Sequence, residues 1–139
     1  LCDRGYELVV ISNQAGIGDG VYPESALWDI QKKMLAEFTQ RGVRIRSSHY
    51  CLHGKKAGCS CRKPETGLFK QAVDGVTYDP GQTYFIGDKA SDVEAGKRFG
   101  IHTIFVRTGH GKFDEPKLSG TLKPDYLVDK LPDVLEILH

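Results

Sequence analysis

The sequence lacks a long hydrophobic run and an excess of charge of either sign. No apolar stretch approaches the roughly 20 residues of a membrane-spanning helix, so we expect no membrane partner. The formal net charge of +1 gives no reason to expect nucleic acid or an anionic membrane as a partner. At 139 residues and 40% hydrophobic content, the chain can bury a core, and we assign residues 1–139 to a single domain.

The sequence also lacks cysteines spread along the chain, as a disulfide framework would have them. Three of its four cysteines, Cys51, Cys59 and Cys61, fall within one short segment together with His53, whereas Cys2 is remote. Cysteines clustered with a histidine favour a metal site in a reducing compartment. We therefore expect a cytoplasmic protein.

The segment CLHGKKAGCSC, residues 51–61, offers two close pairs of metal ligands across a short loop. Structural zinc takes four thiolate or imidazole ligands in a tetrahedron, and four protein ligands leave no open position for catalysis. The spacing therefore predicts structural Zn²⁺, and its ligands are Cys51, His53, Cys59 and Cys61. The alternative is a set of reduced cysteines beside an unrelated histidine.

Short apolar runs alternate with segments of helical periodicity. Strands are expected at residues 7–12, 43–51, 83–87, 102–106 and 126–128, and helices at residues 23–40, 66–73, 90–99 and 131–138. This β-α-β order predicts an α/β fold, a three-layer, Rossmann-like, mostly parallel sheet with helices on both faces and a small zinc-bound loop. Residues 109–123 are expected to form a long polar loop.

Ligands of such sheets bind at the carboxyl ends of the strands, so the residues that follow the strands are candidates for the site. These residues are Ser12-Asn13-Gln14, Arg62-Lys63, Gly87-Asp88-Lys89 and Arg107-Thr108-Gly109. Hydroxyl, amide and cationic groups suit a phosphoryl group, and the carboxylate of Asp88 suits Mg²⁺. Asp92, one helical turn later, is expected to orient these groups or to cap the turn.

Each motif by itself also fits a glycine-rich turn, a plain helix start or a solvated charge pair. The remaining histidines have no partner that the sequence identifies; they are His49, His102, His110 and His139.

Taken in order, the motifs resemble the haloacid-dehalogenase superfamily of phosphatases, and within it the heptose bisphosphate phosphatases and the related histidinol-phosphatases. The matching features are an (S/T)NQ motif at Ser12, a C-x-H…C-x-C zinc loop at Cys51, an RKP motif at Arg62 and a GD-(K/R)-x-x-D motif at Gly87. Lys89 and the PETGL sequence after Lys63 are similar to the heptose group. Asp19 stands where that group carries an arginine.

The resemblance implies Mg²⁺-dependent hydrolysis of D,D-heptose 1,7-bisphosphate to heptose 1-phosphate through an aspartyl-phosphate, a step of carbohydrate metabolism that serves lipopolysaccharide biosynthesis. By the same resemblance, Ser12 contacts the transferring phosphoryl group, Lys63 stabilises it and Asp88 binds Mg²⁺. The implied substrate-binding residues are Ser12, Asn13, Gln14, Ala15, Arg62, Lys63 and Lys89. The expected partner is a small sugar phosphate, and we expect a monomer.

The family's DxDG(T/V) motif, which carries its nucleophile on the first strand, matches no segment here. The opening LCDRGY resembles the end of the helix before the second strand, so Asp3 is not a displaced nucleophile. We expect an incompletely recorded chain and no turnover from these 139 residues alone. The alternatives are a histidinol-phosphatase and a catalytically inactive phosphate-binding module.

Overall fold

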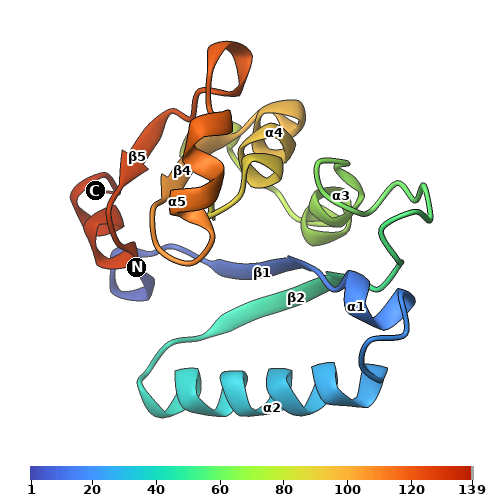
Figure 1. Cartoon of the computed structure of the whole chain (residues 1–139). Helices are drawn as coiled ribbons and strands as arrows, with labels where there is room; N and C mark the ends of the chain where they lie inside the picture. The colour runs from blue at the N-terminus through green and yellow to red at the C-terminus, as the bar shows by residue number, and fades with distance from the viewer. Residues whose placement is uncertain (139) are drawn as a thin grey trace. The chain divides into compact units, whose positions relative to one another are not determined.

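The computed structural model describes residues 1–138, which form two compact units, each with its own parallel sheet (Figure 1). The first unit comprises residues 1–62 and 67–72, and the second comprises residues 63–66 and those from Val73 onward. Every strand pair is parallel, which confirms the predicted α/β class. No helix in the described part of the chain is long and apolar enough to span a membrane.

In the first unit, β1 (Leu8–Asn13) pairs with β2 (Ile45–Cys51), and α2 (Glu24–Gln40) forms the crossover between them. Helix α2 contacts β2 where the Trp28 ring meets Tyr50 edge-on, with 5.8 Å between the ring centroids. The other elements of this unit are a 3₁₀ turn (Cys2–Arg4), α1 (Ala15–Gly18) and most of α3 (Gly67–Val73). Helix α1 lies in a segment for which the sequence indicated only a glycine-rich turn.

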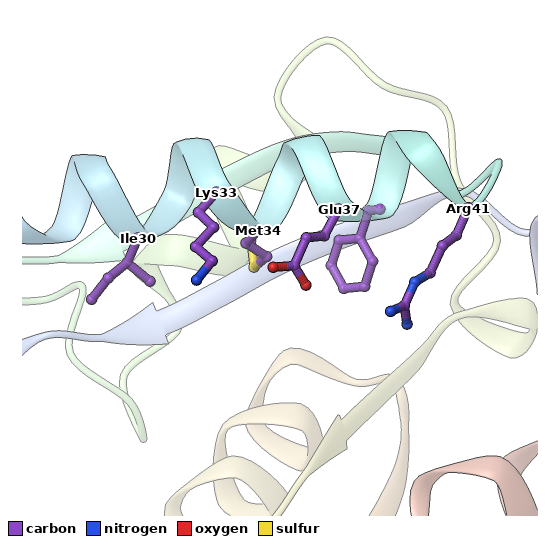
Figure 2. Close-up of a pocket in the computed structure, with 6 residues that line it drawn as sticks. Ile30, Lys33, Met34, Glu37 and Arg41 are labelled. Atoms are coloured by element: carbon purple, nitrogen blue, oxygen red, sulfur yellow. The ribbon is translucent and has the colours of Figure 1, made fainter.

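A shallow groove runs along one side of α2 (Figure 2). Its lining mixes apolar side chains with charges of both signs and consists of Ile30, Lys33, Met34, Glu37, Phe38 and Arg41. None of these residues belongs to a motif identified in the sequence. The groove therefore has no part in the candidate site.

The second unit is built on a three-stranded sheet with the order β3-β4-β5. Its strands are β3 (Tyr84–Gly87), β4 (His102–Val106) and β5 (Tyr126–Val128), and α4 (Ala90–Phe99) connects β3 to β4. A 3₁₀ turn (Pro80–Gln82) precedes β3. The central strand β4 supplies much of the core, which consists of Val93, Ala95, Ile101, Ile104, Phe105, Val106, Val128, Val134 and Leu138.

One prediction for the C-terminal part was wrong, and the structure makes another more specific. Residues 109–123 are not a plain loop, because they contain α5 (Gly111–Asp114) and the 3₁₀ turns Glu115–Lys117 and Gly120–Leu122. The closing helix that was predicted for residues 131–138 is present as a 3₁₀ helix (Leu131–Glu136), the form that short helical segments often adopt. The guanidinium of Arg107 anchors residues 109–123 through an ion pair with Glu115 at 2.8 Å, and it also pairs with Asp129, directly after β5, at 2.7 Å.

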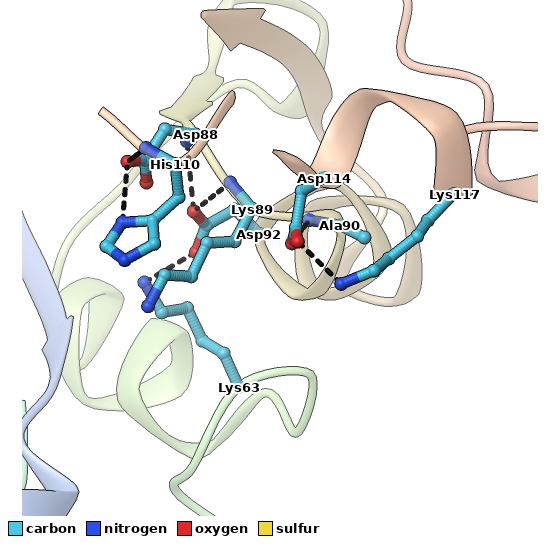
Figure 3. A network of polar contacts seen from close by, with 8 residues as sticks. All are labelled: Lys63, Asp88, Lys89, Ala90, Asp92, His110, Asp114 and Lys117. Atoms are coloured by element: carbon cyan, nitrogen blue, oxygen red, sulfur yellow. Dashed lines mark hydrogen bonds and ion pairs between the residues drawn. The ribbon is translucent and has the colours of Figure 1, made fainter. Parts of the chain in front are cut away.

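Asp114 connects α5 to the start of α4 (Figure 3). Its Oδ1 pairs with Lys117 Nζ at 2.6 Å, and its Oδ2 accepts a hydrogen bond from the backbone N–H of Ala90 at 2.9 Å. The hydrogen bond from Lys117 lowers the pKa of Asp114. Burial acts in the opposite direction and raises this pKa, whereas the hydrogen bond from the Ala90 N–H lowers it further. The contribution of this carboxylate to stability is therefore present above its unfolded pKa, about 3.9, and is lost as the pH falls through the lower folded pKa.

We expect Asp114→Asn to lower the free energy of unfolding by about 1 kcal/mol at pH 7. The difference from the wild type should shrink as the pH falls below about 4 and through the lower folded pKa, because Asp114 then becomes protonated and is uncharged like the asparagine. Urea unfolding at a series of pH values measures this. Asp74→Asn is the matched control, since Asp74 is exposed in the same unit. A difference that does not change with pH would contradict the prediction.

Candidate functional site

The four predicted zinc ligands converge at the end of β2 in the first unit. Cys51 is the last residue of the strand and is fully buried, and the following loop returns the other ligands to it. Its Sγ lies 3.1 Å from the Sγ of Cys61 and 3.5 Å from that of Cys59. His53 Nδ1 lies 3.2 Å from the Sγ of Cys61, and all four donor atoms lie within 4.8 Å of one another. Three thiols and one imidazole at this spacing fit a tetrahedral metal ion.

The thiols of this cluster influence one another's ionisation. Burial disfavours the thiolate of Cys59, but the backbone N–H of Arg62 and the thiols of Cys61 and Cys51 outweigh burial and lower the pKa of Cys59 to about 7. Burial, together with hydrogen bonds to Cys51 and Cys59, raises the pKa of Cys61 to about 12. A cation bound among these sulfur atoms would favour the thiolate form of each of them, because thiolates are the form that ligates metals.

A second polar group, the Ser12 arm, lies at the end of β1 and consists of Ser12, Gln14 and Tyr22. Gln14 Nε2 donates a hydrogen bond to Ser12 Oγ at 2.9 Å, and the hydroxyl of Tyr22 donates to Gln14 Oε1 at 2.7 Å. Because the serine oxygen acts as an acceptor here, its proton is left to donate elsewhere. Acceptor-only groups such as phosphate oxygens suit this arrangement.

Tyr22 was missed by the sequence analysis. A side chain at Gly16 would collide with the tyrosine ring, so the glycine makes room for Tyr22 to reach Gln14. The only available signal was an aromatic hydroxyl at the end of the glycine-rich segment. Asn13 lies in β1, and Ala15 is buried at the start of α1, as parts of the same segment.

In the second unit, Lys63 and Asp92 form a buried ion pair at 2.7 Å (Figure 3). The two side chains are only 9% and 7% exposed. The other oxygen of Asp92 accepts hydrogen bonds from the backbone N–H groups of Asp88 and Lys89, at 3.2 and 3.1 Å. One carboxylate thus orients the lysine and shapes the turn that carries Asp88, as was predicted for Asp92. A side chain at Gly87 would collide with Asp92, so this turn requires glycine.

Asp88 lies beside His110, which the sequence had left without a partner. Asp88 Oδ2 accepts a hydrogen bond from the His110 backbone N–H at 2.8 Å and lies 3.4 Å from His110 Nδ1 (Figure 3). The histidine was missed because it is 22 residues from Asp88 in the chain. Both contacts involve Oδ2, so Oδ1 is available as the kind of oxygen ligand that Mg²⁺ prefers.

The predicted site residues are divided between the two units. The first unit holds Ser12, Asn13, Gln14, Ala15, Arg62 and the four metal ligands, and the second holds Lys63, Asp88 and Lys89. Asp92 brings Lys63, Asp88 and Lys89 together in the second unit. In the first, Arg62 has a buried Nη1 that finds no hydrogen-bond partner among residues 1–138, which suits an anionic ligand.

Comparison with known families decides the class of protein. Residues 60–134 match the model of the HAD-hydrolase-like family. The chain belongs to this family. The D-glycero-beta-D-manno-heptose-1,7-bisphosphate 7-phosphatase of Haemophilus ducreyi is 34% identical over 142 residues, which cover 96% of this chain and 78% of the relative. The D-glycero-alpha-D-manno-heptose-1,7-bisphosphate 7-phosphatase of Campylobacter jejuni is 37% identical over 103 residues, which cover 74% of this chain and 59% of the relative.

The crystal structures of HAD-like phosphatases agree with this membership. The D,D-heptose 1,7-bisphosphate phosphatase of B. bronchiseptica, solved with magnesium and phosphate, has a TM-score of 0.90 and 27% identity. The similarity covers 99% of this chain and 76% of that one. The protein is thus a phosphatase of the HAD-like family, a phosphoric monoester hydrolase, as the motifs predicted.

Proposed function

We propose that this HAD-like phosphatase hydrolyses the 7-phosphate ester of D-glycero-D-manno-heptose 1,7-bisphosphate to leave heptose 1-phosphate. The observation that carries the proposal is the buried Lys63–Asp92 pair beside Asp88. Asp92 holds the ammonium of Lys63 and also the backbone that carries Asp88. Phosphoryl transfer with Mg²⁺ uses both kinds of group, a cation and a carboxylate that binds the metal. The sugar is proposed from the names of the relatives.

The charges of these residues suit the transfer of a phosphoryl group. Negative charge on the phosphoryl oxygens is spread over several atoms in the transition state, and preorganised cations and donors stabilise it. In our proposal the ammonium of Lys63 faces that charge and the hydroxyl of Ser12 donates a hydrogen bond to it. Asp88 would hold Mg²⁺, which when bound offsets further negative charge. The proposed route is an aspartyl-phosphate, whose aspartate we assign to no residue of this sequence.

A bisphosphate substrate has a second phosphate group besides the one that is transferred. Cationic side chains that do not take part in the transfer are available to bind it. We assign Arg62 and Lys89 to substrate phosphate, together with the segment Ser12–Ala15. The buried guanidinium nitrogen of Arg62 supports this assignment, because an orphan donor is satisfied by an acceptor from the ligand. Because the comparisons reach both units, we propose that the chain belongs to a single HAD-like domain.

We further propose that the cluster of Cys51, His53, Cys59 and Cys61 holds structural Zn²⁺. Its donor set supports zinc, since three thiolates and one imidazole are ligands of closed structural zinc sites. Such a site needs reduced thiols, which supports the cytoplasm as the compartment.

Phosphate release from purified protein, expressed from its complete reading frame, tests the proposed function. Both anomers of heptose bisphosphate and histidinol phosphate are supplied with Mg²⁺, and kcat/KM is compared among the three. We expect one heptose anomer to exceed histidinol phosphate by at least about 100-fold, and excess chelator to stop turnover. Saturable binding of all three without phosphate release would reject the proposal in favour of an inactive phosphate-binding module.

Gly109 provides a test of the Asp88 assignment. It has a left-handed φ of 64°, and a side chain there would collide with the Asp88 carboxylate. We expect Gly109→Ala to displace that carboxylate and lower kcat by about 100-fold, as small misplacements of reacting groups do. Phosphate release at saturating Mg²⁺ measures the effect.

Gly100→Ala is the matched control, since Gly100 has a φ of 83° and no atom within 4 Å of an added side chain. It carries the same backbone strain, about 1 kcal/mol, and should keep nearly full turnover. Equal losses in the two variants would contradict the assignment.

A further inference from the structure

We propose that Asp19 is a positioning residue that latches the metal-binding loop onto the segment carrying Ser12, so that the bound metal supports the Ser12 arm. This inference rests on the proposed function and on the proposed zinc site. All of its evidence lies within the first unit.

The two segments run side by side from the strands into the loops. Ser12 is the register partner of Tyr50, and Asn13 is that of the metal ligand Cys51. The pairing continues beyond β1, because the backbone N–H of Gln14 donates to the carbonyl of Cys51 at 2.8 Å. The arm residue Gln14 is therefore bonded directly to the backbone of a metal ligand.

Beyond Gln14, two glycines allow the backbones to meet. A side chain at Gly18 would collide with the backbone of Gly54 and would press against that of His53, another metal ligand. A side chain at Gly54 would in turn collide with the Asp19 carboxylate. Helix α1 thus packs on the metal-binding loop without any intervening side chain, which is a contact that only glycine on both sides permits.

Asp19 closes this row of contacts. Its Oδ1 and Oδ2 accept hydrogen bonds from the backbone N–H of Lys55, at 3.2 and 3.4 Å. Lys55 is two residues beyond the ligand His53, in a loop rich in lysine and glycine that has little apolar core of its own. The carboxylate therefore connects the loop to α1 at a point where packing contributes little.

These contacts couple metal binding to the position of the Ser12 side chain. A metal ion that fixes Cys51 and His53 also fixes the backbone against which Gln14 and α1 rest. Gln14 in turn orients the Ser12 hydroxyl. Loss of the Asp19 contact should free the loop, release the metal more readily and loosen the Gln14 amide.

The rate of zinc release to a chromogenic chelator tests the latch without requiring catalysis. The zinc-loaded proteins compared are the wild type, Asp19→Ala, Asp19→Asn and Asp29→Ala. Asp29 is an exposed carboxylate on α2, so Asp29→Ala makes the same change of charge away from the loop. We expect release from Asp19→Ala to be roughly two- to tenfold faster, the range that one net hydrogen bond spans. Asp19→Asn keeps an acceptor oxygen and should remain near the wild-type rate.

A second readout follows the arm itself. The side-chain amide signals of Gln14 in ¹⁵N NMR spectra should shift or broaden in Asp19→Ala and on removal of zinc, and should be restored in Asp19→Asn. Unchanged release from Asp19→Ala overturns the inference, as does an equal acceleration in Asp29→Ala or in Asp19→Asn. Failure to find any turnover would reject the proposed function alone, since neither readout uses a substrate. Absence of bound zinc in the wild type would reject the zinc site and the latch together.

Discussion

Removal of the metal from the Cys51–Cys61 loop is expected to unfold that loop and most of the first unit. Binding of structural zinc contributes about 10–16 kcal/mol at pH 7, which matches or exceeds the roughly 5–15 kcal/mol by which whole domains are stable. The side chains of the loop contribute little packing, because in residues 52–60 they are exposed or half-exposed. A strong chelator or the Cys51→Ser substitution should therefore produce a large loss of structure.

Metal analysis and circular dichroism measure this effect. The wild type should contain about one zinc per chain, and its thermal unfolding temperature should fall by more than about 10 °C after chelation. Cys2→Ser is the control, since Cys2 lies outside the cluster and its thiol makes a long contact, at 3.9 Å, with the carbonyl of Arg44. A metal-free preparation that remains fully folded would refute the zinc assignment.

Replacement of Lys63 with alanine is expected to lower kcat by about 10²–10³-fold, as the loss of one preorganised group that stabilises transition-state charge does. The lysine is well prepared for that role. Asp92 holds its ammonium at 2.7 Å, and the Phe85 ring lies beneath it with 5.0 Å from Nζ to the ring centroid. Phosphate release under saturating substrate, from protein expressed from its complete reading frame, measures the loss.

The same substitution should also destabilise the protein. Without Lys63, the Asp92 carboxylate remains buried and unpaired, which costs about 3–5 kcal/mol. The double variant Lys63→Met, Asp92→Asn removes both charges and should regain much of this stability without regaining turnover. Lys70→Ala, at an exposed position of α3, should change neither property. Recovery of kcat in the double variant would show that Lys63 acts only through folding.

The sequence determined those features that depend on neighbouring residues. Helix α4 begins and ends where its periodicity and the stop at Gly100 predicted, since Gly100 adopts the left-handed conformation that ends helices. The four candidate metal ligands could be grouped from the sequence because their spacing within one short loop is itself the geometric requirement of such a site. The strands likewise followed from short apolar runs bounded by glycine and polar residues, within one or two residues of their bounds.

Only the tertiary structure decided which distant side chains meet. Nothing local indicates that His110 lies beside Asp88, that Lys63 pairs with Asp92 or that Asp19 reaches the N–H of Lys55, which is 36 residues away. Such contacts depend on strand order, register and the close approach of glycine backbones, which are set by packing of the whole unit. The residue types therefore revealed the chemistry of the site, whereas the partners that orient each group came from the fold.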